Sequence, residues 1–124
     1  MTTLYRGEGD VIDYPNTGTA ISAGDVIVLG TTIENMLGVA LTDIAATTGV
    51  GAVGIEGVFD LPKVSGAVIL AGDAVFWDAS ASEVDDDQAT KATGDFTCGV
   101  AMESAGNGVT TIAVKLNGFT TTIT

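Results

Sequence analysis

Histidine is absent from the 124-residue chain, and cysteine occurs once. Without histidine the chain lacks the commonest general base, the Ser-His-Asp and Cys-His arrangements, and imidazole metal ligands. The single Cys98 excludes an intramolecular disulfide and a cysteine-based metal framework. Because Cys98 precedes Gly99-Val100-Ala101 in a predicted strand, we expect a small buried hydrophobe and not a reactive thiol. We predict no catalytic residue, no cofactor and no metal site, so that the protein is not an enzyme.

Positive charge is also scarce. Four Lys and Arg residues stand against sixteen Asp and Glu residues, for a formal charge of −12. Phosphate backbones repel such a polyanion, because nucleic-acid affinity depends on cations that release condensed counterions. Anionic membrane surfaces repel it for the same reason. We therefore predict no nucleic-acid partner and no membrane partner; the alternative is that the charge only confers solubility.

Long apolar segments are missing as well. The longest uncharged stretch worth testing, Ile44 to Ile55, is too short to span a bilayer and is interrupted by three glycines. The first ten residues carry Arg6, Glu8 and Asp10 and have no apolar core of the kind that signal peptides contain. We expect a soluble protein that is made in the cytoplasm.

The residues that are abundant favour short strands. The apolar set is dominated by Ala and Val, and seventeen glycines supply turn positions. No segment of twelve or more residues keeps a helical apolar pattern without glycine interruption or a β-branched run. We predict an all-β protein, a small antiparallel β-barrel or β-sandwich, built as one domain over residues 1–124. The predicted strands are Val11 to Tyr14, Asp25 to Leu29, Leu37 to Leu41, Gly51 to Leu61, Ala67 to Leu70, Ala74 to Trp77, Cys98 to Met102 and Val109 to Leu116.

An internal repeat is visible in the chain. Gly38-Val39-Ala40-Leu41 recurs as Gly99-Val100-Ala101-Met102, 61 positions later, and the same displacement pairs Ala52-Val53 with Ala113-Val114. Nearer the start, Ala23-Gly24-Asp25 resembles Ala71-Gly72-Asp73 with a displacement of 48 positions. These matches predict two pseudo-repeated halves, the second with a longer connection between its first two strands. The alternative is chance similarity between strands of biased composition.

The longer connection would lie in residues 78–95, which include an acidic segment from Ser82 to Asp87. We expect an exposed loop or hairpin there. Its carboxylates, Glu83 and residues 85–87, are the type of ligand that calcium prefers, but they lack the spacing of a calcium-binding loop. A solvated segment is therefore favoured over a cation site.

Adjacent Phe76 and Trp77 stand in a predicted strand. Neighbouring side chains on a strand point to opposite faces, so both rings cannot enter the same core. One ring is then expected either to contact another subunit or to be buried beneath a loop or the other sheet.

Several segments follow one another in an order that indicates a known family. They are Gly9-Asp10-Val11-Ile12, Ile21 to Val28, Gly38-Val39-Ala40, Glu56 to Lys63, Ala71 to Asp78, Gly99-Val100-Ala101 and Val114 to Gly118. In this order they resemble the phage capsid cement proteins, which are small head-decoration proteins. The resemblance spans about nine-tenths of the chain, although each motif alone is short.

This resemblance implies a barrel or sandwich protein that associates as homotrimers at capsid symmetry axes and reinforces the assembled shell. Its partners would be the major capsid protein and its own copies, and its place the outer capsid surface of the virion. It implies no active site. Residues 1–10 and 119–124 are expected to be terminal arms. The expected capsid or subunit contacts are Tyr5, Arg6, Tyr14, Trp77 and Phe119.

A second class of function is a secreted or fibre-associated β module that binds carbohydrate or protein. Few lysines, many threonines and a single tryptophan are compatible with it. The missing export signal and the lack of clustered aromatic residues weigh against it.

Overall fold

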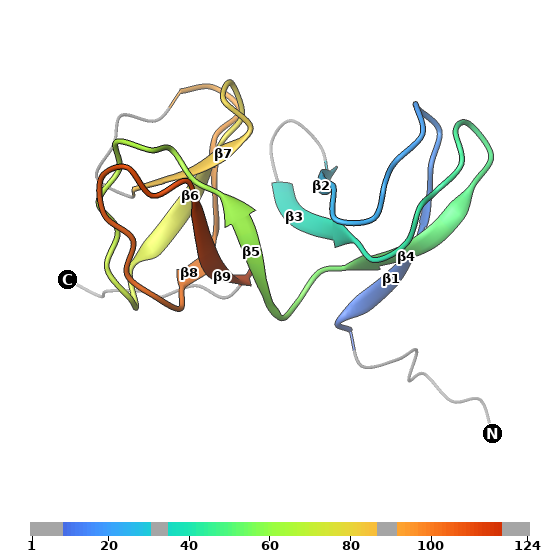
Figure 1. The fold of residues 1–124 in the computed structure, drawn as a ribbon. Coiled ribbons are helices and arrows are strands. Elements are labelled where there is room, and N and C mark those ends of the chain that lie inside the picture. The colour runs from blue at the N-terminus through green and yellow to red at the C-terminus, as the bar shows by residue number, and fades with distance from the viewer. Residues whose placement is uncertain (1–8, 31–34, 87–91, 118–124) are drawn as a thin grey trace.

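The computed structural model describes residues 9–30, 35–86 and 92–117. In this part the chain forms nine strands and no helix (Figure 1), which confirms the all-β class. It follows that none of the described segments is a helix long and apolar enough to cross a membrane. The strands are β1 (Val11–Pro15), β2 (Val26–Gly30), β3 (Asn35–Ala40), β4 (Val50–Gly54), β5 (Val58–Pro62), β6 (Ala74–Asp78), β7 (Glu83–Asp86), β8 (Phe96–Ala101) and β9 (Thr111–Leu116).

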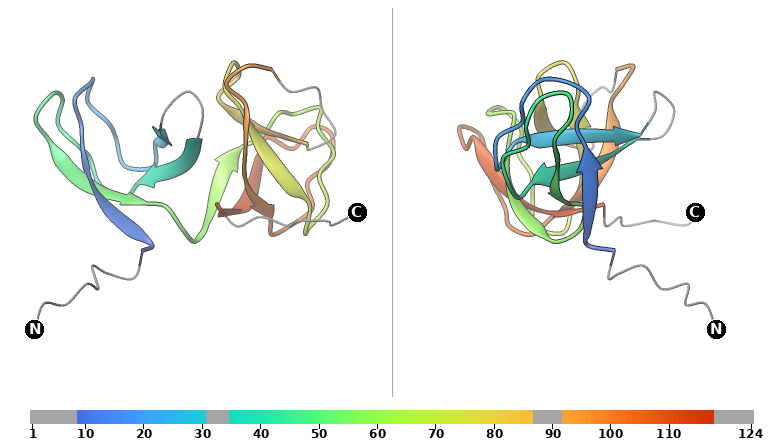
Figure 2. Two further views of the ribbon diagram at one scale, coloured as in Figure 1. Left: turned by 180° about the vertical axis from the view of Figure 1, so that it is seen from behind. Right: turned by 90° about the vertical axis from the view of Figure 1, so that its right-hand side faces the viewer.

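The strands pair into two antiparallel sheets. The first sheet has the order β1-β4-β3-β2, and the second has the order β5-β9-β8-β6-β7. Figure 1 and the left view of Figure 2 show the two sheets side by side, joined by the chain that passes from β4 into β5. Over the described residues neither sheet closes into a barrel, although a parallel bridge between Lys63 and Val84 brings the outer edges of the second sheet close at one point.

The two sheets have matching connectivity, and their registers match except at a bulge in the second sheet, where Phe76 of β6 pairs with Thr97 and not with Cys98. Strands β1, β4, β3 and β2 correspond in order to β5, β9, β8 and β6. Ile12 pairs with Val53 in the first sheet, and Phe59 pairs with Val114 in the second, at displacements of 47 and 61 positions. Likewise, the Ile27–Gly38 pair corresponds to Val75–Gly99, at displacements of 48 and 61 positions. The difference lies in β7, which the second sheet adds on the outer edge of β6.

A larger and a smaller hydrophobic cluster hold these sheets together. The larger cluster contains side chains from the second sheet together with Leu37 and Val39 from β3, so it crosses the boundary between the sheets. The smaller cluster contains Ile27, Ala40, Ile44 and Val53 and lies within the first half. Burial alternates along β9, as expected for a strand with one face toward a core.

Gly38 and Gly99, the glycines of the two Gly-Val-Ala segments, stand where strands approach closely. A Cβ atom at Gly38 would lie 2.5 Å from Cγ1 of Val53, and one at Gly99 would overlap the carbonyl oxygen of Lys115. Both positions therefore require the absence of a side chain. The sequence match between these segments reflects equal packing constraints in the two sheets.

Two strand predictions were wrong. Gly51 to Leu61 is not one strand, because a turn separates β4 from β5 and Gly57 adopts a φ of 120° that L residues rarely reach. Ala67 to Leu70 contributes only an isolated bridge between Ile69 and Ala105.

The acidic segment forms strand β7, whose Glu83 pairs with Asp78 of β6. The hairpin prediction is therefore confirmed for the described residues, whereas Asp87 lies outside them. The segment is less exposed than expected: Val84 is fully buried, and its acidic neighbours within β7 are half-buried.

Candidate functional site: the groove between the two sheets

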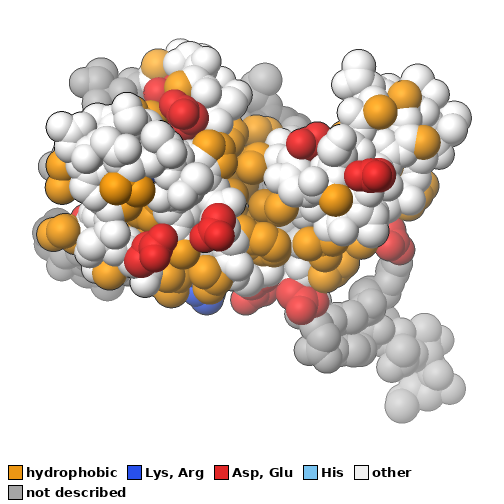
Figure 3. Space-filling view, viewed as in Figure 1, with side chains coloured by type: hydrophobic (Ala, Val, Ile, Leu, Met, Phe, Trp, Pro, Cys, Tyr) orange, Lys and Arg blue, Asp and Glu red, His pale blue; other side chains and the backbone are white. Residues whose placement is uncertain are grey.

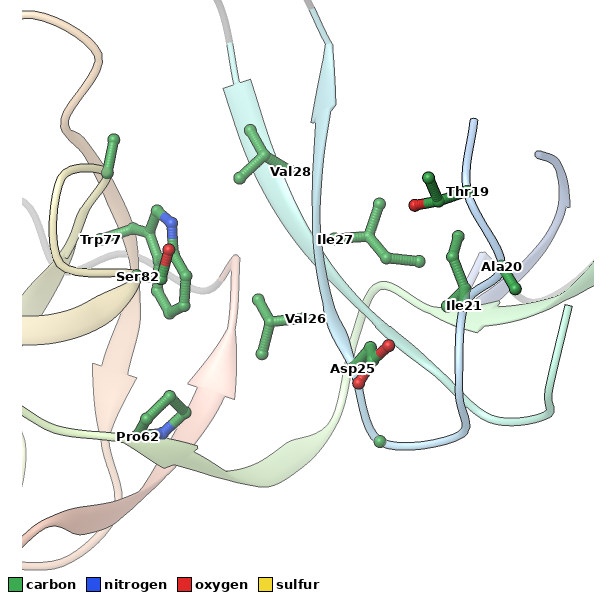
Figure 4. A pocket seen from close by; sticks show the side chains of 12 residues that line it. Thr19, Ala20, Ile21, Asp25, Val26, Ile27, Val28, Pro62, Trp77 and Ser82 are labelled. Atoms are coloured by element: carbon green, nitrogen blue, oxygen red, sulfur yellow. The ribbon is translucent and has the colours of Figure 1, made fainter. Parts of the chain in front are cut away.

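An open groove of about 570 Å³ lies between β2 of the first sheet and the β6–β7 hairpin of the second. Val26 and Val28 form one wall, while Pro62, Trp77 and Ser82 form the other (Figure 4). Hydrophobic side chains gather along this seam, and acidic side chains are scattered over the surrounding face (Figure 3). An open groove with both polar and apolar lining residues and a strand edge in its wall is suited to hold a segment of another polypeptide.

Trp77 sits at the base of this groove. Its side chain belongs to the larger hydrophobic cluster and is only 4% exposed, and its indole ring faces Val26 and Val28 across the groove (Figure 4). Phe76 is also buried, at 1% exposure. Both rings are thus covered largely within the chain. Contact of Trp77 with another subunit or the capsid stays a prediction.

Asn117, at the end of β9, ties the two sheets together at the boundary. Its Nδ2 donates to the carbonyl oxygens of Leu37 (2.9 Å) and Ile55 (2.6 Å), and its Oδ1 accepts from the backbone N–H of Leu37 (3.3 Å). The residue has a φ of 56°, a left-handed conformation that asparagine tolerates better than most residues. Asn117 therefore joins the first sheet and the β4–β5 linker to the second sheet.

Sequence reasoning did not single out the role of Asn117. The closing segment Val114 to Gly118 contributes to the family resemblance, but its sequence indicates no hydrogen-bond role for Asn117. The hydrogen-bond partners of Asn117 lie 80 and 62 positions away in the chain. Only the packing of the two sheets brings them together.

Lys63 and Asn16 are buried donors in corresponding places of the two halves. The Nζ of Lys63 donates to the carbonyl oxygens of Val64 (2.8 Å), Gly106 (3.1 Å) and Val109 (3.1 Å), and its side chain is fully buried. The Nδ2 of Asn16 donates to the carbonyl oxygens of Thr19 (2.7 Å) and Ala45 (3.1 Å). Asn16, which follows β1, and Lys63, which follows β5, each hold neighbouring loops by these hydrogen bonds. The Lys63 ammonium group is therefore buried and is not exposed as a surface cation.

The side chains considered for catalysis or metal binding are the Cys98 thiol and the carboxylates. Burial raises the pKa of the Cys98 thiol to about 12, and its Sγ lies 3.7 Å from the carbonyl oxygen of Val75. Near neutral pH this thiol is protonated and a poor nucleophile. Among residues 9–30, 35–86 and 92–117, no three His, Cys, Asp or Glu side chains are grouped so as to hold a metal ion.

The carboxylate of Asp78 closes the turn between β6 and β7 at the rim of the groove. The hydroxyl of Ser80 donates to Oδ1 of Asp78 at 2.7 Å, and the backbone N–H groups of Ser80 and Ala81 also donate to it. The Ser80 hydroxyl has the largest effect and lowers the pKa of Asp78, desolvation opposes it to a lesser extent, and the N–H groups of Ala81 and Ser80 lower the pKa further. The turn beside Trp77 is thereby held by its own hydrogen bonds.

The predicted contact residues do not form one cluster. Tyr14 lies on β1 and packs against the smaller hydrophobic cluster, whereas Trp77 lies in the second sheet. Tyr5, Arg6 and Phe119 lie outside the described residues. Asp10, the last residue of the predicted N-terminal arm, accepts a hydrogen bond from Ile55 through its carbonyl oxygen at 2.9 Å.

Comparison with known proteins gives one match. A family model described as phage cement protein matches residues 7–116, a range that contains all nine strands. Neither a curated protein nor a solved structure matches the chain.

Proposed function

The chain belongs to the phage cement protein family, and from this premise we propose that it binds the outer surface of an assembled phage head and stabilises the shell. Cement proteins are structural proteins of the phage capsid, not enzymes. We further propose that the protein docks as trimers at symmetry axes, in contact with the major capsid protein. The observation that carries the proposal is the family match over residues 7–116.

Cementing has a simple physical basis. A protein that binds the assembled lattice more tightly than its loosened form stabilises the lattice by the difference in binding free energy. Many copies act together, because each bound trimer would join several shell subunits at once. No bond is made or broken in this function.

The surface of the protein supports such a role. Val11, Val50 and Val58 are exposed, and burial of such apolar side chains at a contact with the shell would contribute to binding. We propose that the N-terminal arm, with Tyr5, Arg6 and Tyr14, contacts the shell, and that Trp77 and Phe119 lie at contacts with the shell or with neighbouring copies. The arm supplies Arg6, a cation in an otherwise anionic chain.

We also propose that the described sheets are pseudo-repeated halves of a single domain over residues 1–124. The support is the shared order of four strands, the shared register outside the bulge between Val75 and Phe76, and the corresponding positions of Asn16 and Lys63. The larger hydrophobic cluster, which takes Leu37 and Val39 from the first half, favours one folding unit over two.

The proposal is tested by mixing the purified protein with capsids that lack decoration. We expect saturable binding whose copy number matches the symmetry axes of the shell, and a trimer mass either in solution or on the particle. A variant without residues 1–9 should bind more weakly if the arm contacts the shell. Absence of binding to the parent capsid would refute the proposed function.

A further inference from the structure

The outer edges of β2 and β6 occupy corresponding places but differ in their pairing. In the second sheet, β6 pairs with β8 on one side and with β7 on the other. In the first sheet, β2 pairs with β3 and, within the described residues, no strand pairs with its other side. As far as the described residues show, the first sheet therefore has an unpaired edge at β2 where the second sheet has strand β7.

The lengths of the connections explain the difference. The connection from β6 to β8 spans residues 79–95 and contains β7, whereas the connection from β2 to β3 spans only residues 31–34. Four residues suffice for a hairpin loop but not for an added strand with a turn at each end. The chain between β2 and β3 thus cannot supply a counterpart of β7.

The free edge of β2 borders the groove. Val28 on β2 is 45% exposed, whereas the corresponding Phe76 on β6 is 1% exposed. An edge strand with unpaired N–H and C=O groups is a template for a strand from another chain. We propose that the edge of β2 accepts an extended segment of a partner protein as a fifth strand of the first sheet; this rests on the proposed function, with the shell as partner.

The second sheet predicts the register of the incoming strand. Strand β7 runs antiparallel to β6 and pairs its residues 83–86 with residues 75–78. Residues 75–78 of β6 correspond to residues 27–30 of β2, 48 positions earlier in the chain. The incoming strand should therefore run antiparallel to β2, opposite Ile27 to Gly30. Val84, which pairs with Trp77, is fully buried, so the residue opposite Leu29 should be a small apolar one.

Charge favours a neutral or basic segment. Among the residues that the structure describes, Asp25 is the one charged side chain that lines the groove, and the whole chain carries −12. A basic segment gains from this field, whereas a second copy of the same chain would bring further negative charge to it. The occupant is therefore a strand of the shell with small apolar side chains at alternate positions and a cation near Asp25.

Hydrogen exchange of the full chain, free and bound to decoration-free capsids, tests this proposal directly. We expect the solvent-facing amides of Ile27 to Gly30 to exchange at least about tenfold more slowly on the capsid. The central amides of β9, already paired on both sides, serve as an internal reference.

A matched pair of variants adds a binding test. Val28→Asp places a charge at the proposed contact, and Val109→Asp places the same charge at a valine of similar exposure (41%, against 45% for Val28) that precedes β9. We expect Val28→Asp to weaken capsid binding at least about tenfold, and Val109→Asp to change it less than about twofold. If Val28→Asp fails to fold, exchange in the wild-type protein decides alone.

The outcomes separate the two proposals. If the wild-type protein does not bind capsids, the proposed function is wrong. If it binds while the β2 amides exchange as fast as before and Val28→Asp binds normally, strand addition is wrong and cementing stands. Protection of β2 without capsids, together with a dimer mass in sedimentation, would identify a second copy as the occupant and refute the shell strand.

Discussion

The side chain of Asn117 should contribute a large part of the stability of the junction between the sheets. It makes hydrogen bonds to both backbone groups of Leu37 and to the carbonyl oxygen of Ile55. A net contribution of about 1 kcal/mol for each bond gives about 3 kcal/mol. Because alanine in a left-handed conformation adds about 1 kcal/mol of strain, Asn117→Ala should lower the unfolding free energy by about 4 kcal/mol.

Two further variants separate the side chain from the backbone. Asn117→Gly removes the hydrogen bonds without left-handed strain, so it should cost about 3 kcal/mol, less than the alanine variant. Asn117→Asp keeps an acceptor for the N–H of Leu37 but turns an anionic oxygen toward two carbonyl oxygens, so at neutral pH it should cost at least as much as the glycine variant. Asn107→Ala, in an exposed turn, is the control and should change stability by less than about 0.5 kcal/mol.

Urea denaturation, followed by far-ultraviolet circular dichroism and by Trp77 fluorescence, measures these differences. Because Trp77 lies beside the junction, both signals should report the loss. Exchange of the Leu37 amide should also accelerate in Asn117→Gly. If Asn117→Ala and Asn107→Ala have the same unfolding free energy, the hydrogen bonds of Asn117 do not hold the sheets together.

Three other substitutions test the interior. Folding raises the pKa of Cys98 from 9.0 to about 12, so the unfolded chain releases the thiol proton first, and the free energy of unfolding should be constant below pH 9 and fall by about 1.4 kcal/mol per pH unit above it. Urea titrations at pH 8 and 10 measure this fall, which should be absent in Cys98→Ala. Gly99→Ala should lower the free energy of unfolding by about 3 kcal/mol or prevent folding, because its Cβ would overlap the backbone of Lys115. Gly106→Ala, which has open space at its Cβ, should change it by less than about 0.5 kcal/mol, and equal melting temperatures of the two variants would contradict this. Lys63→Met should lower the unfolding free energy by about 3 kcal/mol, because three carbonyl oxygens lose their donor, and an unchanged urea midpoint would refute that role.

Local patterns in the sequence were sufficient to locate most strands. Short apolar runs between turn residues predicted β1, β2, β6 and β9 to within two residues of their observed ends. The long segment Gly51 to Leu61 misled because its apolar residues continue through the bend, and only the positive φ of Gly57 separates the two strands. Strand β7 carries little local strand signal, since three of its four residues are acidic, and it forms by pairing with β6.

The junction was beyond sequence reasoning for a different reason. Asn117 and Lys63 act through backbone groups that are distant in the chain, and nothing in their neighbours indicates such partners. The groove likewise depends on how the two sheets pack. Composition favoured a β scaffold, but it contained no information on which strand edge of that scaffold lies beside the groove.

The temperature at which decoration-free capsids rupture, measured with increasing amounts of the protein, tests the central claim most directly. A cement protein binds the intact lattice preferentially, so the rupture temperature should rise with concentration and level off when the binding sites are full. A rupture temperature that stays constant while the protein demonstrably occupies the shell would contradict the account.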